Sequence, residues 1–383
     1  MNPTRNRKLK RTLVFLLILF VLQETTLRIA FPVPEISNFD RCYYVSKGIL
    51  PESRHHLRNQ NWYWMSSPDT HHRFVSEMNL YGFRDDEWSV SNNSGKTRVL
   101  FLGDSFVEGI MAEQHETIPT GFKNESNDIE VMNAGVLGVG PTAYLQLATD
   151  MAPIFKPDIA IMCIYANDLG QNVPIIPTTH LKARHHAILK PRFMTWISEN
   201  SERGPLYSRW HSGEEPYLLP FVSKHGQELT PIQRAIKQGT FNGNRVGAIE
   251  EEAGYLRVRA QLGACVPYFV QVCKDVGTEP IIVYIPSKHQ LTRHYMPFEQ
   301  AVNPSINPDS LDLTTIEYQR HAAELKMACK ASGVAFLDLT PILKSEEERK
   351  NHLYWNYDEH MRGTGYLLVG REIRKFATSK GLL

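Results

Sequence analysis

Beyond residue 96, the chain alternates between short apolar runs and longer helix-like stretches. The apolar runs lie at 98–102, 130–133, 158–165, 281–285 and 334–339, and the helix-like stretches cover 142–155, 251–275, 315–332 and 363–380. Continuous apolar strands separated by helices are typical of a parallel sheet that is covered on both faces. Crossovers in such sheets are nearly always right-handed, which favours a doubly wound arrangement. We therefore predict an α/β fold, a three-layer α/β/α sandwich around a five-stranded parallel sheet.

Two stretches fall outside this alternation. Residues 32–95 are rich in aromatic residues, proline and histidine, and we expect them to form an N-terminal elaboration of the domain at 96–383. Residues 172–250 form an insertion after the third strand, with many prolines and glycines and little periodicity. Loops of that length are uncommon in compact domains unless they are functional. Two interpretations stay open, a lid or substrate wall over the carboxyl edge of the sheet and a solvated embellishment.

The extreme N-terminus, residues 1–31, has a different character. Five basic residues precede the first acidic one, and residues 13–22 are wholly apolar. A basic segment followed by an apolar one is the pattern of a secretory signal, but no small-residue cleavage site follows it. Extended to Phe31, the helix reaches roughly 20 residues, enough to cross a bilayer. We favour an uncleaved signal anchor with an exported body. A cleaved signal peptide and a buried N-terminal helix are the alternatives.

Composition narrows the class of protein. The 383 residues are 42% hydrophobic and 22% charged with a formal net charge of +1, so the chain can bury a core and offers no basic surface for nucleic acid. The five cysteines are too widely spaced for a disulfide framework, although an exported domain could hold one bridge. Histidine doublets at 55–56, 71–72 and 185–186 point to different faces and rarely chelate one ion. We expect no metal and no cofactor, and the oligomeric state stays open.

Catalytic side chains follow several of the predicted strands. Ser105 comes directly after the first strand, at the sheet edge where open α/β sheets bind ligands. A serine needs a positioned base, and His360 with Asp358 near the end of the chain supplies an imidazole and a carboxylate. The developing oxyanion needs hydrogen-bond donors. The candidates are the backbone N–H groups of Ser105 and Gly138 and the side-chain amide of Asn167.

Four sequence blocks together resemble the SGNH (GDSL-type) hydrolase family, in its membrane-anchored type. They are Gly103-Asp104-Ser105, Asn133-Ala-Gly-Val-Leu-Gly138, Ala166-Asn167-Asp168, and Asp358-Glu359-His360 with Gly363-Thr-Gly-Tyr366 after it. A lead-in at Asn79-Leu-Tyr-Gly-Phe-Arg84 is similar to a segment of anchored members. The resemblance implies a flavodoxin-like fold, Ser105, His360 and Asp358 as the catalytic residues, and Ser105, Gly138 and Asn167 as the oxyanion hole.

The chain departs from the family pattern at two places, and a third position argues against another fold. Many members have two residues between the acid and the histidine, whereas only Glu359 lies between them here, so Asp358 and Glu359 both stay candidates to orient His360. Tyr165 stands where the family usually has glycine, which would narrow the pocket. Val107 breaks the Gly-x-Ser-x-Gly pattern of the other large serine-hydrolase fold.

Three function classes fit these observations. The first is an exported, membrane-tethered serine esterase that acts on O-acyl groups, with acetyl esters of carbohydrate among the substrates. The second is an O-acyltransferase that passes the acyl group from the same serine to a polysaccharide. The third is a carbohydrate-binding or assembly protein without catalysis. The presence of Ser105, Gly138, Asn167 and His360 together favours the two enzymes over the binding protein.

Overall fold

The computed structural model describes residues 3–30, 61–65, 73–79, 81–124, 126–166, 168, 191, 193, 252–298, 320–356 and 358–383. The strands are β1 (Asn61–Met65), β2 (Arg73–Glu77), β3 (Thr97–Gly103), β4 (Ile129–Gly135), β5 (Ile159–Tyr165), β6 (Glu279–Ile285) and β7 (Ala335–Asp338). The longer helices are α1 (Pro3–Ala30), α4 (Ile118–Lys123), α5 (Pro141–Phe155), α11 (Glu252–Val276), α14 (Arg320–Ser332), α15 (Thr340–Glu348) and α16 (Gly363–Ser379). Single turns form α3 (Ser105–Glu108), η1 (Gln114–Glu116), α12 (Lys288–Leu291) and η4 (Arg293–Tyr295).

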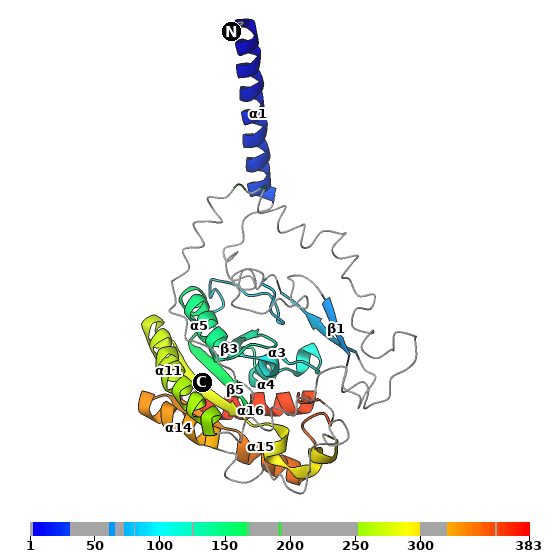
Figure 1. Cartoon of the computed structure of the whole chain (residues 1–383), viewed down its shortest axis with the longest axis vertical. Helices are drawn as coiled ribbons and strands as arrows, with labels where there is room; N and C mark the ends of the chain where they lie inside the picture. The colour runs from blue at the N-terminus through cyan, green and yellow to red at the C-terminus, as the bar shows by residue number, and fades with distance from the viewer. Residues whose placement is uncertain are drawn as a thin grey trace.

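The central sheet has five parallel strands in the order β4-β3-β5-β6-β7. This is the doubly wound, flavodoxin-like order, and it confirms the predicted fold class. Helices α5, α11 and α14 pack beside one another on the sheet, and α16 packs on α4, so the sheet lies between two helical layers (Figure 1). From β3 the chain first moves outward to β4 on one side and then returns to β5 on the other side of β3, so the direction of winding reverses at β3. The carboxyl end of β3 therefore opens at the topological switch point, where such sheets bind ligands.

The ends of the predicted strands and helices differ little from the observed ones where the structure describes them. Helices α4 and α15 were not predicted, and residues 315–319 of the predicted helix at 315–332 lie outside the described residues. The predicted insertion at 172–250 also lies outside them, apart from positions 191 and 193.

Part of the predicted N-terminal elaboration joins the core of the sheet domain. β1 and β2 form an antiparallel pair, and the segment after them buries Tyr81, Phe83 and Trp88 in the same hydrophobic cluster as β3 and α5. The Trp88 ring centre lies 5.0 Å from that of Phe83 and 5.6 Å from that of Phe155 at the end of α5. The segment at 81–88 is thus integrated into the core, while the boundary at residue 96 stays a prediction.

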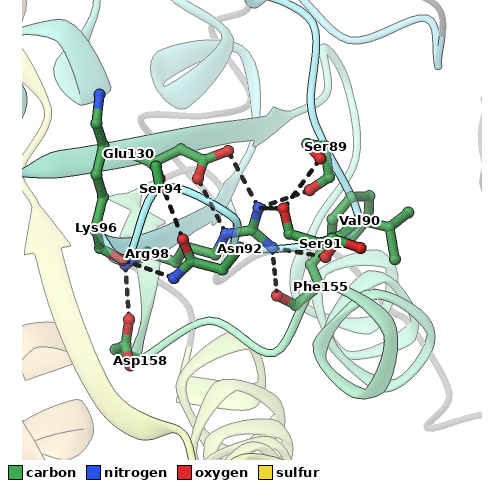
Figure 2. Close-up of polar contacts among 10 residues, drawn as sticks. All are labelled: Ser89, Val90, Ser91, Asn92, Ser94, Lys96, Arg98, Glu130, Phe155 and Asp158. Carbon is green, nitrogen blue, oxygen red and sulfur yellow. Dashed lines mark hydrogen bonds and ion pairs between the residues drawn. The ribbon is translucent and has the colours of Figure 1, made fainter.

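Arg98 binds the residues that follow this segment, 89–91, to the sheet at the end opposite the switch point. Its side chain is almost fully buried at the start of β3, and its guanidinium binds the Glu130 carboxylate of β4 at 3.0 Å (Figure 2). The guanidinium also donates to the backbone carbonyls of Ser89, Val90, Ser91 and Phe155, at 2.7, 2.8, 3.1 and 3.0 Å. One side chain therefore joins residues 89–91, the carboxyl end of α5 and two strands.

Helix α1 carries the predicted anchor sequence. Residues Lys10–Ala30 form a 21-residue apolar helix with a mean hydropathy of 1.9, long enough to cross a membrane by length and composition. Its apolar side chains from Leu13 to Leu22 are exposed and take no part in the described core. Glu24 and Arg28 form an i,i+4 ion pair at 2.7 Å. A signal sequence would have the same features, so the choice between anchor and signal peptide stays a prediction.

Candidate active site

Ser105 lies at a tight junction between β3 and α3. The Asp104 side chain caps α3 by accepting a hydrogen bond from the Phe106 N–H at 2.9 Å, which makes Ser105 the first helical residue. A side chain at Gly103 would meet Val107 at 2.3 Å, so the turn depends on glycine there. The N–H of a first helical residue has no partner within its helix. Ser105 therefore presents both its hydroxyl and its backbone N–H at the switch point.

His360 and Asp358 reach Ser105 from the loop before α16. His360 Nε2 lies 2.8 Å from Ser105 Oγ, and His360 Nδ1 lies 2.6 Å from Asp358 Oδ1. The same Asp358 oxygen accepts the backbone N–H of His360 at 2.8 Å. This pattern fits the tautomer with its proton on Nδ1, so that Nε2 accepts from the serine. Of the two acidic residues that the sequence left open, Asp358 is the one hydrogen-bonded to the imidazole.

Charges around the site favour the imidazolium form of His360. Burial alone lowers the pKa of His360, but Asp358, with Glu359 and Asp104, outweighs burial and raises it above its ordinary value. For Asp358, burial acts to raise the pKa, but the charge and hydrogen bonds of His360 outweigh burial and lower it. A histidine with a raised pKa is a stronger base once it is deprotonated. Any reaction that uses His360 as a base should therefore run best above the ordinary imidazole pKa, about 6.5.

Two further buried carboxyl groups lie close to this charge network. Burial raises the pKa of Asp104 to about 7. Burial, with repulsion from Asp104, also raises the pKa of Asp168 well above its ordinary value. Asp168 accepts hydrogen bonds from the Tyr144 hydroxyl and the Tyr165 N–H, each at 2.8 Å, which hold the end of β5.

The predicted oxyanion donors are described only in part. Gly138 lies in the turn after β4 with φ of 76°, a left-handed conformation that favours glycine. Its neighbour Leu137 donates its N–H to the Glu108 carboxylate at 2.5 Å, which ties this turn to α3. Asn167 lies outside the described residues. The role of Ser105, Gly138 and Asn167 as an oxyanion hole stays a prediction.

Sequence reasoning missed two charged residues that support these segments, Glu108 and Lys288. Glu108 is fully buried three residues after Ser105. Lys288 comes three residues after the end of β6 and is buried beneath the loop that carries Asp358. Ser105 drew attention because it lies just beyond the carboxyl end of a parallel strand. Lys288 has the same kind of position, so the same rule would have identified it.

The described residues contain no cluster of three or more histidine, cysteine or acidic side chains that could hold a metal ion. The three histidine doublets and Cys42 lie outside that part of the chain. The other four cysteines are buried as free thiols.

No protein-family model and no curated protein matches this chain. Among solved structures it is similar to a lipase/acylhydrolase from Enterococcus faecalis, with 12% identity and a TM-score of 0.38 over 74% of this chain and 96% of the other. It is also similar to a GDSL-like lipase from Bacteroides thetaiotaomicron (11%, TM-score 0.33, 76% and 93%) and to the acetyl xylan esterase AlAXEase (12%, TM-score 0.34, 74% and 98%). At these identities and TM-scores the likeness carries no argument about activity. The functional assignment depends on the geometry of the site.

Proposed function

We propose that this protein is a serine esterase of the SGNH (GDSL-type) family that hydrolyses O-acyl esters through an acyl-serine intermediate. One observation carries the proposal, the continuous hydrogen-bonded series from Ser105 Oγ through both ring nitrogens of His360 to Asp358. A serine is a weak nucleophile until an adjacent base can take its proton and a third group orients that base. Such a series at a topological switch point is the arrangement that acyl transfer requires.

In the proposed reaction, Ser105 Oγ attacks the ester carbonyl carbon while His360 Nε2 takes the hydroxyl proton. The bond to the alcohol then breaks, the alcohol leaves with the proton from His360, and the acyl group stays on Ser105. Water attacks the acyl-serine with His360 again as base, which releases the carboxylic acid and restores Ser105. Asp358 keeps the imidazole in the required tautomer and stabilises the imidazolium that forms in each step.

The proposed oxyanion hole consists of the Ser105 and Gly138 N–H groups and the Asn167 amide. Two features support it. The Ser105 N–H lies at a helix start, and Gly138 has a left-handed conformation that favours glycine, in a turn tied to α3. Loss of one such donor typically lowers kcat by about 100-fold to 1000-fold.

The membrane and substrate parts of the proposal rest on the N-terminal helix. We propose that α1 spans the membrane with its basic end in the cytoplasm and that the catalytic domain is exported. A tethered, exported esterase would meet cell-surface polysaccharide, so acetyl esters of carbohydrate are its proposed substrates. Intact mass of the membrane-extracted protein tests the anchor. A chain that retains residues 1–31 supports the proposal, and a chain cleaved after them contradicts it.

The deciding experiment measures p-nitrophenyl acetate hydrolysis and fluorophosphonate labelling of the full chain in detergent. We expect turnover and labelling that disappear in Ser105→Ala. His360→Ala should lower kcat by several orders of magnitude, and the double variant should lose little more, because the two residues act as a unit. Asn167→Ala should lose the activity expected of one oxyanion donor.

Three results would contradict the proposal. They are activity that survives Ser105→Ala, losses that multiply in the double variant, and the absence of both turnover and labelling in the unmodified chain. If the chain is active, release of acetate from acetylated polysaccharide, compared with transfer to an added sugar acceptor, separates hydrolysis from acyl transfer.

A further inference from the structure

Lys288 is a buried lysine directly beyond the carboxyl end of β6. Its side chain is 2% exposed, although lysine is almost never fully buried unless it is paired. The turn that carries it is fixed by a capping box in which Gln290 accepts the Ser287 N–H at 2.8 Å. Gln290 also accepts the Tyr284 hydroxyl of β6 at 3.1 Å. Lys288 is therefore held at a defined place relative to the sheet.

The Lys288 ammonium group binds the backbone of the loop that leads to His360. Its Nζ donates to the carbonyl oxygens of Trp355, Asn356 and Asp358, at 3.3, 2.7 and 3.1 Å. An ammonium group has three N–H donors, which matches these three acceptors. The Tyr295 ring centre lies 5.3 Å from Nζ on another side. Burial of a charge is costly unless hydrogen bonds compensate it, so this is a built contact and not a chance approach of a surface lysine.

Other hydrogen bonds also hold this loop, among them a backbone bond across it from the Trp355 N–H to the His360 carbonyl at 3.1 Å. The Tyr354 hydroxyl donates to the Pro286 carbonyl at 2.7 Å, and Trp355 Nε1 donates to the Met111 carbonyl at 3.2 Å. The bond from Lys288 to the Asp358 carbonyl continues the attachment to the residue whose side chain holds His360.

We propose that Lys288 is a positioning residue of the Ser105–His360–Asp358 site, which fixes the loop so that Asp358 faces His360 Nδ1. This inference rests on the proposed function. Lys288 acts indirectly, through the backbone carbonyls of Trp355, Asn356 and Asp358 and through its positive charge. A displacement of about 1 Å at the reacting groups lowers rates by about 100-fold, which sets the scale of the expected effect.

The charge of Lys288 provides a readout that a merely structural residue lacks. Burial alone would raise the pKa of Asp358. The charge and hydrogen bonds of His360, together with the charge of Lys288, outweigh burial and lower this pKa. Removal of the ammonium group takes a positive charge from the neighbourhood of the pair, so both the Asp358 and the His360 pKa should rise. The pH at which His360 becomes an active base should then move upward.

The experiment uses the full chain in detergent with Lys288→Met, which keeps most of the stem, and Lys288→Gln, which keeps a neutral donor. Lys330→Met, at an exposed position of α14, controls for loss of a lysine charge. The first measurement is hydrogen exchange by mass spectrometry, in peptides that cover 353–362 and in peptides of β3 and β5. The second is the rate of Ser105 phosphonylation by a fluorophosphonate across pH values from about 5 to 9. In that reaction the Ser105 oxygen bonds to phosphorus, fluoride leaves, and His360 takes the proton.

We expect both Lys288 variants to exchange faster at 353–362 with β3 and β5 unchanged. Lys288→Met should be phosphonylated about 100-fold more slowly, with its pH midpoint shifted upward, and Lys330→Met should match the unmodified chain. Unchanged exchange at 353–362 and an unchanged pH midpoint would overturn the inference. A second combination would also overturn it, namely slower phosphonylation with an unchanged pH midpoint, together with faster hydrogen exchange throughout the sheet. If Lys288→Met unfolds, the same criteria apply to Lys288→Gln.

The two proposals fail in different ways. An unmodified chain that is not phosphonylated at Ser105 contradicts the proposed function. In that case, faster hydrogen exchange at 353–362 in the Lys288 variants still shows that Lys288 holds the loop. Unchanged exchange there would overturn the inference about Lys288 as well.

Discussion

Replacing Arg98 by methionine removes the guanidinium that joins residues 89–91 to the sheet. Methionine keeps a flexible stem of similar length but donates no hydrogen bond. The carbonyls of Ser89 and Ser91 belong to exposed residues and can turn to water, so their loss costs little. The Phe155 carbonyl accepts from Arg98 in a buried bond at the carboxyl end of α5. An orphaned buried acceptor costs about 1–3 kcal/mol.

The ion pair with Glu130 adds a second cost. The Glu130 side chain is 24% exposed, so water partly replaces the lost cation. A hydrogen bond to a charged group contributes about 1.5–3 kcal/mol, and partial solvation places this pair toward the lower end. The sum is about 3–4 kcal/mol, within the range for breaking a buried pair from one side. Arg98→Lys keeps the charge without the planar fork and should lose about half of this.

Urea unfolding of the three proteins in one detergent checks these values, with the transition followed by tryptophan fluorescence. Limited proteolysis adds a local test, because cleavage should appear first near residues 89–91. Arg98 lies seven residues before Ser105 along β3, or about 20 Å, so labelling of Ser105 per folded molecule should not change. A loss of less than about 1 kcal/mol in Arg98→Met would refute the reasoning, as would equal losses in both variants.

Two further predictions concern the site and the helix contacts. Asp104→Asn keeps the acceptor that caps α3 but removes a carboxyl group with a pKa of about 7, whose charged form raises the pKa of His360. The low-pH limb of Ser105 labelling should therefore move to lower pH, and an upward shift or none would contradict the assigned sign. A side chain at Gly370 of α16 would meet the Ile118 carbonyl of α4 at 2.2 Å, so Gly370→Ala should cost about 1–3 kcal/mol or more by overpacking. Gly263→Ala, at an open position of α11, should instead stabilise by up to about 1 kcal/mol, and thermal unfolding of both variants compares them.

The sheet could be predicted because its inner strands are buried on both faces. The runs at 98–102 and 158–165 correspond to β3 (Thr97–Gly103) and β5 (Ile159–Tyr165), each nearly free of polar residues. A strand of this kind needs no knowledge of its partners to be recognised. The position of Ser105 followed from the same pattern, because the run ends directly before it.

Helix α4 shows what the local pattern lacks. It has six residues, including Pro119 and Gly121, and its sequence carries only a start signal, the Thr117 N-cap with a proline in the first turn, and no apolar periodicity of its own. Its contacts explain it, since Gly121 and Gly370 allow the backbones of α4 and α16 to approach closely. Arg98 is similar, because it looks like an ordinary polar strand residue while its partners extend from residue 89 to residue 155. Such features depend on tertiary contacts and become visible only in the fold.

The choice between Asp358 and Glu359 has a local physical reason that the sequence did contain. Asp358 Oδ1 accepts both the backbone N–H and the ring Nδ1 of His360, two residues further on. An aspartate that accepts the N–H of the residue two positions later forms an Asx turn, a conformation that its short side chain favours. Glu359 is adjacent to His360 and has a longer side chain, so it has no equivalent turn. The single-residue spacing therefore places the carboxylate by local geometry, and the hydrogen bond from Lys288 to the Asp358 carbonyl fixes the direction in which this turn faces Ser105.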